Sequence, residues 1–125
     1  MVKILIVDDS ALARRGTRKI LEGAGYEVVE ADEGFSALER FFVEKPSVVL
    51  LDVTMKDMDG IEVLKRLREV DGNAKVVIVT ADVQSSTRGL AQEGGACGFV
   101  IKPVRAEGLL EAVQKALSEV TRAID

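Results

Sequence analysis

Three kinds of polar side chain stand where short apolar runs of the sequence end, and together they are able to do chemistry. They are Asp8 and Asp9 after residues 3–7, Asp52 after residues 48–51, Thr80 after residues 75–79 and Lys102 after residues 97–101. Asp52 is the clearest case, because the four residues before it are all aliphatic, as in a strand buried on both faces. A charge is costly to bury, so Asp52 must meet solvent or a cation.

Carboxylates dominate this set, and carboxylates that lie close together raise one another's pKa unless a cation lies between them. Oxygen ligands without histidine or thiolate favour a hard ion, and a half-open site suits Mg²⁺ better than Ca²⁺. A carboxylate, a divalent ion and a nearby ammonium are the components of a phosphoryl-transfer site. We therefore expect Asp52 to be a nucleophile that forms an acyl phosphate.

The elements that must position these side chains are visible as apolar periodicity. We predict five strands, at residues 3–7, 26–30, 48–51, 75–79 and 97–101, each followed by a helix. The alternation at residues 26–30 is typical of a more exposed edge strand. Helical spacing predicts these inward-facing side chains: Ala13, Thr17, Ile20, Leu21 and Ala24; Ala37, Leu38, Phe41 and Phe42; Ile61, Leu64 and Leu67; Leu109, Leu110, Val113, Ala116, Leu117 and Val120.

The ends of the predicted helices differ in quality. Ser10 is a good N-cap for the first helix, which Gly25 ends, and Pro46 ends the second. The fourth helix contains weak helix formers at residues 85–87 and 89, so we expect it to be the least stable. Arg105 stands at the N-cap position of the last helix, where a poor cap costs about 1 kcal/mol.

Five strand–helix units indicate a single α/β domain with a doubly wound parallel sheet and helices on both faces. In such a sheet, ligands bind beyond the carboxyl ends of the strands, where the strand order reverses. The polar side chains named above all end or follow strands of one polarity. The fold is therefore expected to gather them into one cluster.

Composition narrows the possible functions. A net charge of −4 and the absence of a basic run argue against a nucleic-acid surface. The chain has no histidine, which excludes histidine triads, histidine metal ligands and a phosphohistidine of its own. Cys97 is the only cysteine, so we expect no internal disulfide and a cytoplasmic location. No stretch approaches the roughly 20 apolar residues of a membrane span.

The most specific signal is a set of short motifs that runs in order through nearly the whole chain. These are Ile6-Val7-Asp8-Asp9-Ser10, Leu51-Asp52-Val53-Thr54-Met55, Met58-Asp59-Gly60, Val79-Thr80-Ala81 and Phe99-Val100-Ile101-Lys102-Pro103. On these residues the sequence resembles the receiver domain of two-component response regulators, and is similar to the stand-alone chemotaxis receivers. The resemblance implies a flavodoxin-like sheet of order 2-1-3-4-5, with residues 1–125 as the receiver domain.

The resemblance also implies roles for individual residues. Asp52 would accept a phosphoryl group from a sensor histidine kinase, a phosphotransfer protein or a small phosphodonor. Asp9, Asp52 and the backbone carbonyl of Thr54 would bind Mg²⁺, with Asp8 acting through water. Lys102 would pair with the phosphoryl oxygens as a compact point charge.

A conformational switch is implied as well. Thr80 would donate its hydroxyl to the phosphoryl group, and Phe99 would move into the space that Thr80 leaves. The surface of the fourth helix, fifth strand and fifth helix would then change and be read by a downstream protein. The protein would be a monomer or a phosphorylation-linked dimer, and would catalyse only its own phosphorylation and dephosphorylation. The peptide bond between Lys102 and Pro103 is expected to be cis.

Two departures from the family pattern stand near the proposed site. Lys56 occupies the usual proline position in the loop after the phosphoacceptor, where its charge could contact a phosphodonor or a kinase. Thr54 and Asp82 occupy the variable positions that tune the lifetime of the phosphoryl group through water access. The sequence does not determine that lifetime.

Other interpretations remain open at this point. Taken singly, Asp8 and Asp9 could merely stabilise a helix N-terminus, and Phe99 could be ordinary core. An aspartate-nucleophile phosphatase would need a second aspartate where Thr54 stands, and a flavin or dinucleotide carrier would need a glycine-rich loop after the first strand. An unphosphorylated interaction domain is a further alternative. The receiver could also be a module cut from a longer regulator, with a DNA-binding or enzymatic effector beyond Asp125.

Overall fold

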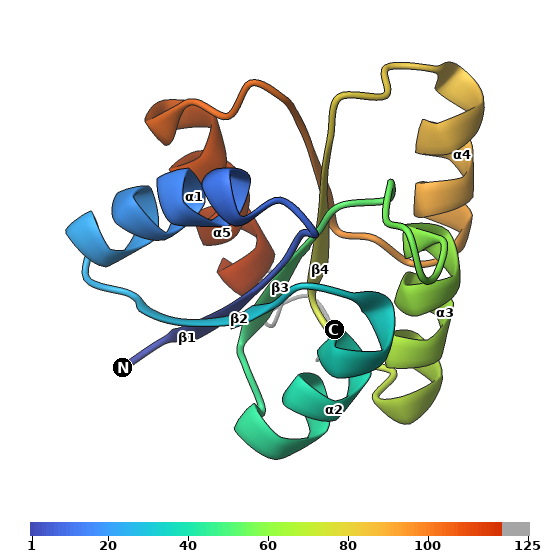
Figure 1. Ribbon diagram of the computed structural model, residues 1–125, viewed down its shortest axis with the longest axis horizontal. Helices are drawn as coiled ribbons and strands as arrows, with labels where there is room; N and C mark the ends of the chain where they lie inside the picture. Colours follow the sequence, from blue (N-terminus) through green and yellow to red (C-terminus); the bar gives the residue numbers. More distant parts are fainter. Residues whose placement is uncertain (119–125) are drawn as a thin grey trace.

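A five-stranded parallel sheet forms the centre of the computed structural model, which describes residues 1–118 (Figure 1). The strand order is β2-β1-β3-β4-β5, so the predicted doubly wound topology is confirmed. In chain order the elements are β1 Lys3–Val7, α1 Ala11–Gly23, β2 Glu27–Ala31, α2 Gly34–Glu44, β3 Val48–Leu51, α3 Gly60–Val70, β4 Val76–Thr80, α4 Ser85–Glu93, β5 Gly98–Ile101 and α5 Ala106–Ser118.

Helices cover both faces of the sheet (Figure 1). Alternate residues of β1 point to opposite faces: Ile4 and Ile6 belong to the core under α1 and α5, whereas Leu5 and Val7 belong to the core under α2, α3 and α4. β3 and β4 are buried along their whole length. Burying each such aliphatic side chain contributes about 1.5–3 kcal/mol, which explains their unbroken apolar sequence.

The two edges of the sheet are more exposed. β2 lies at one edge and begins at Glu27, one residue later than predicted, and β5 lies at the other. Because an edge strand has a neighbour on one side only, its side chains need not all be apolar. The predicted exposed strand in this region is confirmed.

Two predicted inward-facing residues are wrong. α1 begins at the predicted cap, where the Ser10 hydroxyl accepts a hydrogen bond from the Ala13 N–H at 3.1 Å, but it ends at Gly23. Ala24 therefore caps the helix and is exposed. Phe42 is 72% exposed, because Phe41 already fills the buried stripe of α2 and the next residue is turned about 100° away.

α5 packs as predicted over the residues that the structure describes. Leu109, Val113 and Ala116 are buried against the sheet. The helix begins at Ala106, and the carbonyl of Arg105 accepts a hydrogen bond from the Leu109 N–H at 3.0 Å. Arg105 therefore holds the N-cap position, as predicted.

Val120, the last predicted inward residue, lies outside the described residues. Within residues 1–118, no helix is both long and apolar enough to cross a membrane.

Candidate functional site

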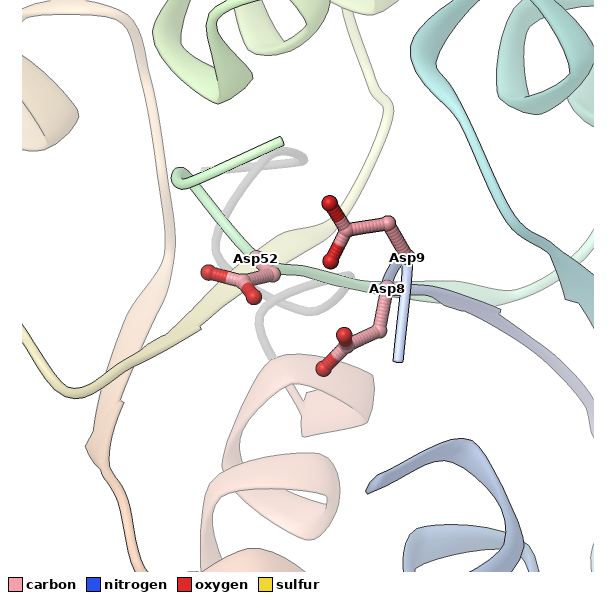
Figure 2. Close-up of side chains that lie close together, drawn as sticks. All are labelled: Asp8, Asp9 and Asp52. Carbon is pink, nitrogen blue, oxygen red and sulfur yellow. The ribbon is translucent and has the colours of Figure 1, made fainter. Parts of the chain in front are cut away.

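Three carboxylates meet at the carboxyl ends of β1 and β3. These strands are neighbours, with Val7 paired to Leu51, so the residues that follow each strand leave the sheet side by side. Ligand oxygens of Asp8, Asp9 and Asp52 all lie within 4.8 Å of one another (Figure 2). Asp8 and Asp52 are buried, whereas Asp9 is exposed.

Lys102 reaches this acidic cluster (Asp8, Asp9 and Asp52) from the far edge of the sheet. It follows β5, and its Nζ lies 2.8 Å from Asp8 Oδ2 and 3.2 Å from Asp52 Oδ2. Since β4 separates β5 from β3, the long lysine side chain must cross the end of β4. The Lys102–Pro103 peptide bond is cis, as expected.

The same local turn orients both buried carboxylates. Asp8 Oδ1 accepts a hydrogen bond from the Ser10 N–H at 2.8 Å, and Asp52 Oδ1 accepts one from the Thr54 N–H at 3.0 Å. Aspartate side chains often bond to the backbone two residues ahead in this way. Each buried carboxylate thus gives one oxygen to its own turn and the other to Lys102.

The electrostatics of the cluster leave negative charge in excess. Burial raises the pKa of Asp52, and the neighbouring Asp8 charge adds to this effect, although the Thr54 N–H and Lys102 oppose it. Burial alone would lower the pKa of Lys102, but its contacts with Asp8 and Asp52 raise it overall. Lys102 therefore stays protonated, and one ammonium faces three carboxylates.

The loop after Asp52 is packed closely against the start of α3. A Cβ atom on Gly60 would lie 2.2 Å from the Val53 Cα and 2.6 Å from the Asp52 carbonyl oxygen, so only glycine fits. The Gly60 N–H donates a hydrogen bond to the Val53 carbonyl at 3.0 Å. The close approach explains why a glycine begins this helix beside the cluster.

Asp57 ties the same loop to another helix. Its carboxylate accepts hydrogen bonds from the Gly34 N–H at 3.0 Å and the Phe35 N–H at 3.2 Å, and so caps the N-terminus of α2. These bonds lower the pKa of Asp57. Sequence reasoning missed this contact, because the partners are more than 20 residues away along the chain. Lys56, the neighbouring residue, is exposed.

Thr80 is the last residue of β4 and is only 1% exposed. Its Oγ1 accepts a hydrogen bond from the Asp82 N–H at 3.1 Å. Asp82 in turn accepts bonds from the Thr87 hydroxyl at 2.6 Å and the Gln84 N–H at 2.9 Å, and these bonds lower its pKa. Asp82 thereby ties the β4–α4 loop to the first turn of α4.

Phe99 lies in β5 and packs partly buried against the core under α2, α3 and α4. The Arg88 guanidinium of α4 stands 4.9 Å from the centre of its ring, within cation–π range. A groove of about 520 Å³ runs between α4, β5 and α5, with Phe99 in its lining. The predicted switch residue therefore lies on the surface that was expected to change.

Comparisons with known proteins cover most of the chain. The profile of the response regulator receiver domain matches residues 4–114. The chain is 40% identical over 117 residues to the chemotaxis protein CheY of Bacillus subtilis (strain 168), an alignment that spans 93% of this chain and 98% of the relative. A CheY-like receiver domain protein from Methanospirillum hungatei JF-1 superposes with a TM-score of 0.92 at 30% identity, covering 98% of each chain.

A second solved structure extends the comparison. A chain in the crystal structure of the CheX-CheY-BeF3-Mg²⁺ complex from Borrelia burgdorferi matches with a TM-score of 0.87 at 29% identity, over 90% of this chain and 87% of that chain. Family profile, sequence relatives and fold all indicate the same family. The chain therefore belongs to the response regulator receiver domain family and is similar to CheY.

Proposed function

We propose that this receiver domain is a phosphorylation-activated response regulator in which Asp52 accepts the phosphoryl group. The observation that carries the proposal is the place of the Asp52 carboxylate, 3.2 Å from the Lys102 ammonium and within 4.8 Å of two further carboxylates. Lys102 supplies one positive charge for these three acids, so negative charge remains in excess and the carboxylates repel one another. The arrangement has a use when a cation and a phosphoryl group complete it.

The donor set fits Mg²⁺. Every candidate ligand is a carboxylate or carbonyl oxygen, and the excess negative charge calls for a cation. Asp9, Asp52 and the backbone carbonyl of Thr54 would hold the ion directly, and Asp8, already bonded to Lys102 and the Ser10 N–H, would act through water. When bound, Mg²⁺ neutralises the charge of the carboxylates and of the incoming phosphoryl oxygens. The similar chain from Borrelia burgdorferi comes from a complex that contains magnesium, which supports this choice.

The chemical step is a transfer between two oxygens, or from nitrogen to oxygen. A carboxylate oxygen of Asp52 attacks the phosphorus atom, and the bond from phosphorus to the donor breaks. The donor leaves with that electron pair, as acetate from acetyl phosphate or as neutral histidine from a phosphohistidine that is protonated on its other ring nitrogen. Lys102, kept protonated by its acidic neighbours, then pairs with the phosphoryl oxygens. Water later attacks phosphorus and releases phosphate, so the domain turns over only its own phosphoryl group.

The switch follows from what the phosphoryl group offers to Thr80. The Thr80 oxygen now accepts the Asp82 N–H, and a phosphoryl oxygen would give its hydroxyl a strong new acceptor. A shift of Thr80 would pull the β4–α4 loop inward and let Phe99 move, which changes the surface of α4, β5 and α5. We expect a protein target there, since the groove lies on that surface. The Borrelia burgdorferi complex joins its CheY to the protein CheX, which supports a protein partner.

The remaining parts of the proposal rest on the sequence and its family resemblance. The location is expected to be cytoplasmic, the domain is expected to be a monomer or a phosphorylation-linked dimer, and an effector could follow it in a longer regulator. Thr54 and Asp82 would set the phosphoryl lifetime, and Lys56 would face the phosphodonor. A phosphatase remains disfavoured, since Thr54 stands where its acid/base would be needed.

A mass measurement tests the proposal. Incubation with Mg²⁺ and acetyl phosphate, followed at once by mass spectrometry of the intact chain, should show the gain of one phosphoryl group. The gain should vanish in Asp52→Asn and should persist in Asp57→Asn, which alters an aspartate of the same loop outside the acidic cluster. No gain in the wild type, or an equal gain in Asp52→Asn, would contradict the assignment.

A further inference from the structure

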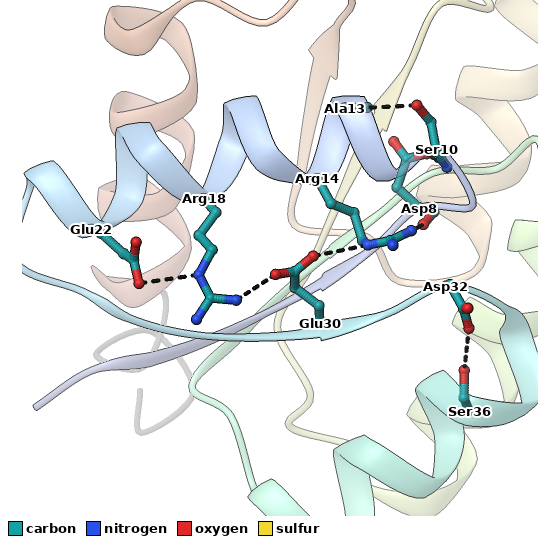
Figure 3. Close-up of polar contacts among 9 residues, drawn as sticks. All are labelled: Asp8, Ser10, Ala13, Arg14, Arg18, Glu22, Glu30, Asp32 and Ser36. Carbon is teal, nitrogen blue, oxygen red and sulfur yellow. Dashed lines mark hydrogen bonds and ion pairs between the residues drawn. The ribbon is translucent and has the colours of Figure 1, made fainter.

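All the backbone and side-chain polar groups of Asp8 have partners. Its N–H donates to the Ala31 carbonyl at 3.2 Å, and its two carboxylate oxygens accept from the Ser10 N–H and from Lys102, each at 2.8 Å. The remaining group is the backbone carbonyl, which lies just beyond the last paired residue of β1. Arg14 supplies its partner, because Nη1 of the guanidinium donates to the Asp8 carbonyl at 2.5 Å (Figure 3).

Arg14 is itself anchored. Its Nε lies 2.9 Å from Glu30 Oε1 on β2, so one planar guanidinium joins α1, β1 and the edge strand (Figure 3). The Arg14 side chain is only 16% exposed, and the Glu30 side chain is 28% exposed. Partial burial would raise the pKa of Glu30, but hydrogen bonds from Arg18 and Arg14 lower it overall, so Glu30 stays charged. The guanidinium holds its donors in a rigid planar fork, whereas the single ammonium nitrogen of a lysine could not reach both acceptors with this geometry.

The Asp8 carbonyl has a direct bearing on the acidic cluster. It belongs to the peptide plane that joins Asp8 to Asp9, so fixing this oxygen fixes the direction in which the chain leaves β1. Asp9 is exposed and projects from the turn between β1 and α1. The orientation of that peptide plane therefore contributes to where the Asp9 carboxylate lies relative to Asp52.

We propose that Arg14, anchored by Glu30, is a positioning residue that holds the peptide between Asp8 and Asp9 so that the acidic cluster is ready to bind a divalent cation. This inference rests on the proposed function, in which the cluster binds Mg²⁺. Groups that orient metal ligands without touching the metal typically change metal affinity 10–100-fold when they are removed. Arg14 has that position here, since it contacts the backbone of one cluster residue and none of the three carboxylates in the described contacts.

Arg18 offers a matched control on the same helix. It lies one turn later, bonds to the same Glu30 and also pairs with Glu22 at 3.1 Å. Its described hydrogen bonds do not include the Asp8 carbonyl. Removing Arg18 therefore weakens the link between α1 and β2 in a similar way but leaves the peptide of the cluster held by Arg14.

The experiment compares Mg²⁺ binding with stability in Arg14→Met and Arg18→Met. Mg²⁺ dissociation constants come from titrations of the ¹⁵N-labelled protein, followed at the amides of the cluster, and stability comes from urea unfolding without metal. We expect both variants to lose stability, Arg14→Met to bind Mg²⁺ about 10-fold more weakly, and Arg18→Met to stay within about 2-fold of the wild type. Equal dissociation constants in the two variants would overturn the inference.

A second variant keeps the test decisive if Arg14→Met does not fold. Arg14→Lys keeps the charge and most of the stem but cannot bond to Asp8 and Glu30 as a fork, so we expect its Mg²⁺ binding to weaken several-fold. Binding by Arg14→Lys at the wild-type level would contradict a geometric role. A wild type that fails to bind Mg²⁺ would instead contradict the proposed function, so the two failures are distinguishable.

Discussion

Removing the phosphoacceptor charge should stabilise the metal-free protein. Asp52→Asn replaces a buried carboxylate, whose charge is disfavoured by burial and by its acidic neighbours, with a neutral amide of nearly the same shape. Loss of a residue proposed to do the chemistry would then raise the free energy of unfolding. Functional sites often store destabilisation of this kind.

The size of the effect can be worked from the distances. With an effective dielectric constant of about 20, two unit charges 4.8 Å apart repel by about 3.5 kcal/mol. The buried Asp8 repels Asp52 by about this amount, whereas solvent screens the exposed Asp9, which adds much less. Lys102, at 3.2 Å, attracts it by about 5 kcal/mol. The attraction by Lys102 exceeds the repulsion by Asp8 by about 1.5 kcal/mol. Burying a charged group costs several kcal/mol, and this cost outweighs the remaining attraction, since the pKa of Asp52 is raised overall. We therefore expect Asp52→Asn to raise the free energy of unfolding by about 1–2 kcal/mol.

Urea unfolding followed by circular dichroism, at pH 7 with EDTA, measures this gain. Added Mg²⁺ should reduce or reverse the stability difference between Asp52→Asn and the wild type, because the ion stabilises the wild type by mass action and the variant has lost a ligand. The pH dependence has a definite sign. Since the native pKa of Asp52 is raised, the wild type is penalised fully above that pKa, and the penalty disappears as the pH falls toward the ordinary carboxyl value of about 4. The difference between variant and wild type should shrink over the same window.

Asp57 provides a control of opposite sign. Its pKa is lowered by the Gly34 and Phe35 N–H groups, so Asp57→Ala should lower the free energy of unfolding by about 1 kcal/mol, the usual cost of a lost N-cap. The electrostatic reasoning is refuted if Asp52→Asn proves no more stable than the wild type in EDTA at pH 7 while Asp57→Ala behaves as expected.

Two further predictions concern the packing of the loop and the output surface. Gly60→Ala should lower the free energy of unfolding, measured in urea, by about 1–3 kcal/mol, because its Cβ would meet backbone atoms at 2.2 and 2.6 Å. In Gly16→Ala the new Cβ meets no described atom within 4 Å, so that change should stabilise α1, and equal effects would disprove the steric argument. Amide exchange at residues 83–95 and 104–109 should slow when acetyl phosphate and Mg²⁺ are added to the wild type but not when they are added to Asp52→Asn. Unchanged exchange in the wild type would contradict the prediction that phosphorylation orders the surface of α4, β5 and α5.

The sequence predicted that α4 is the least stable helix, and the structure supports this prediction only in part. Gln84, at the N-cap of α4, makes no side-chain capping bond in the described structure, which agrees with the expected weak helix. Asp82, however, accepts bonds from Gln84 and Thr87 and holds the first turn from outside the helix. The family resemblance gave Asp82 a role in tuning the phosphoryl lifetime. Its bonds to the first turn of α4 were missed, because a cap two residues before the N-cap is not a standard capping pattern.

The topology predicted that Asp8, Asp9, Asp52 and Lys102 would lie together, but other contacts between distant parts of the chain were beyond sequence reasoning. The caps that Asp57 provides for α2, and the bonds of Arg14 to Asp8 and Glu30, depend on which loop or strand lies beside which. Phe42 shows the same limit within one helix. Two adjacent phenylalanines cannot share one narrow buried stripe, and only the position of α2 on the sheet decides that Phe41 is the buried one.

The sequence by itself determined the local elements and the chemical type of the site. Unbroken aliphatic runs define buried strands, and helical spacing defines the helices between them. A carboxylate, hydroxyl or lysine at the end of a strand can be recognised from the sequence alone. The tertiary structure decided the rest. Placing β1 beside β3 brought Asp8 and Asp9 within reach of Asp52, and Lys102 could cross β4 to join them. Charges act over a few ångströms of space, whatever their separation along the chain, so the raised pKa of Asp52, the raised pKa of Lys102 and the demand for a cation arise only when the sheet is assembled.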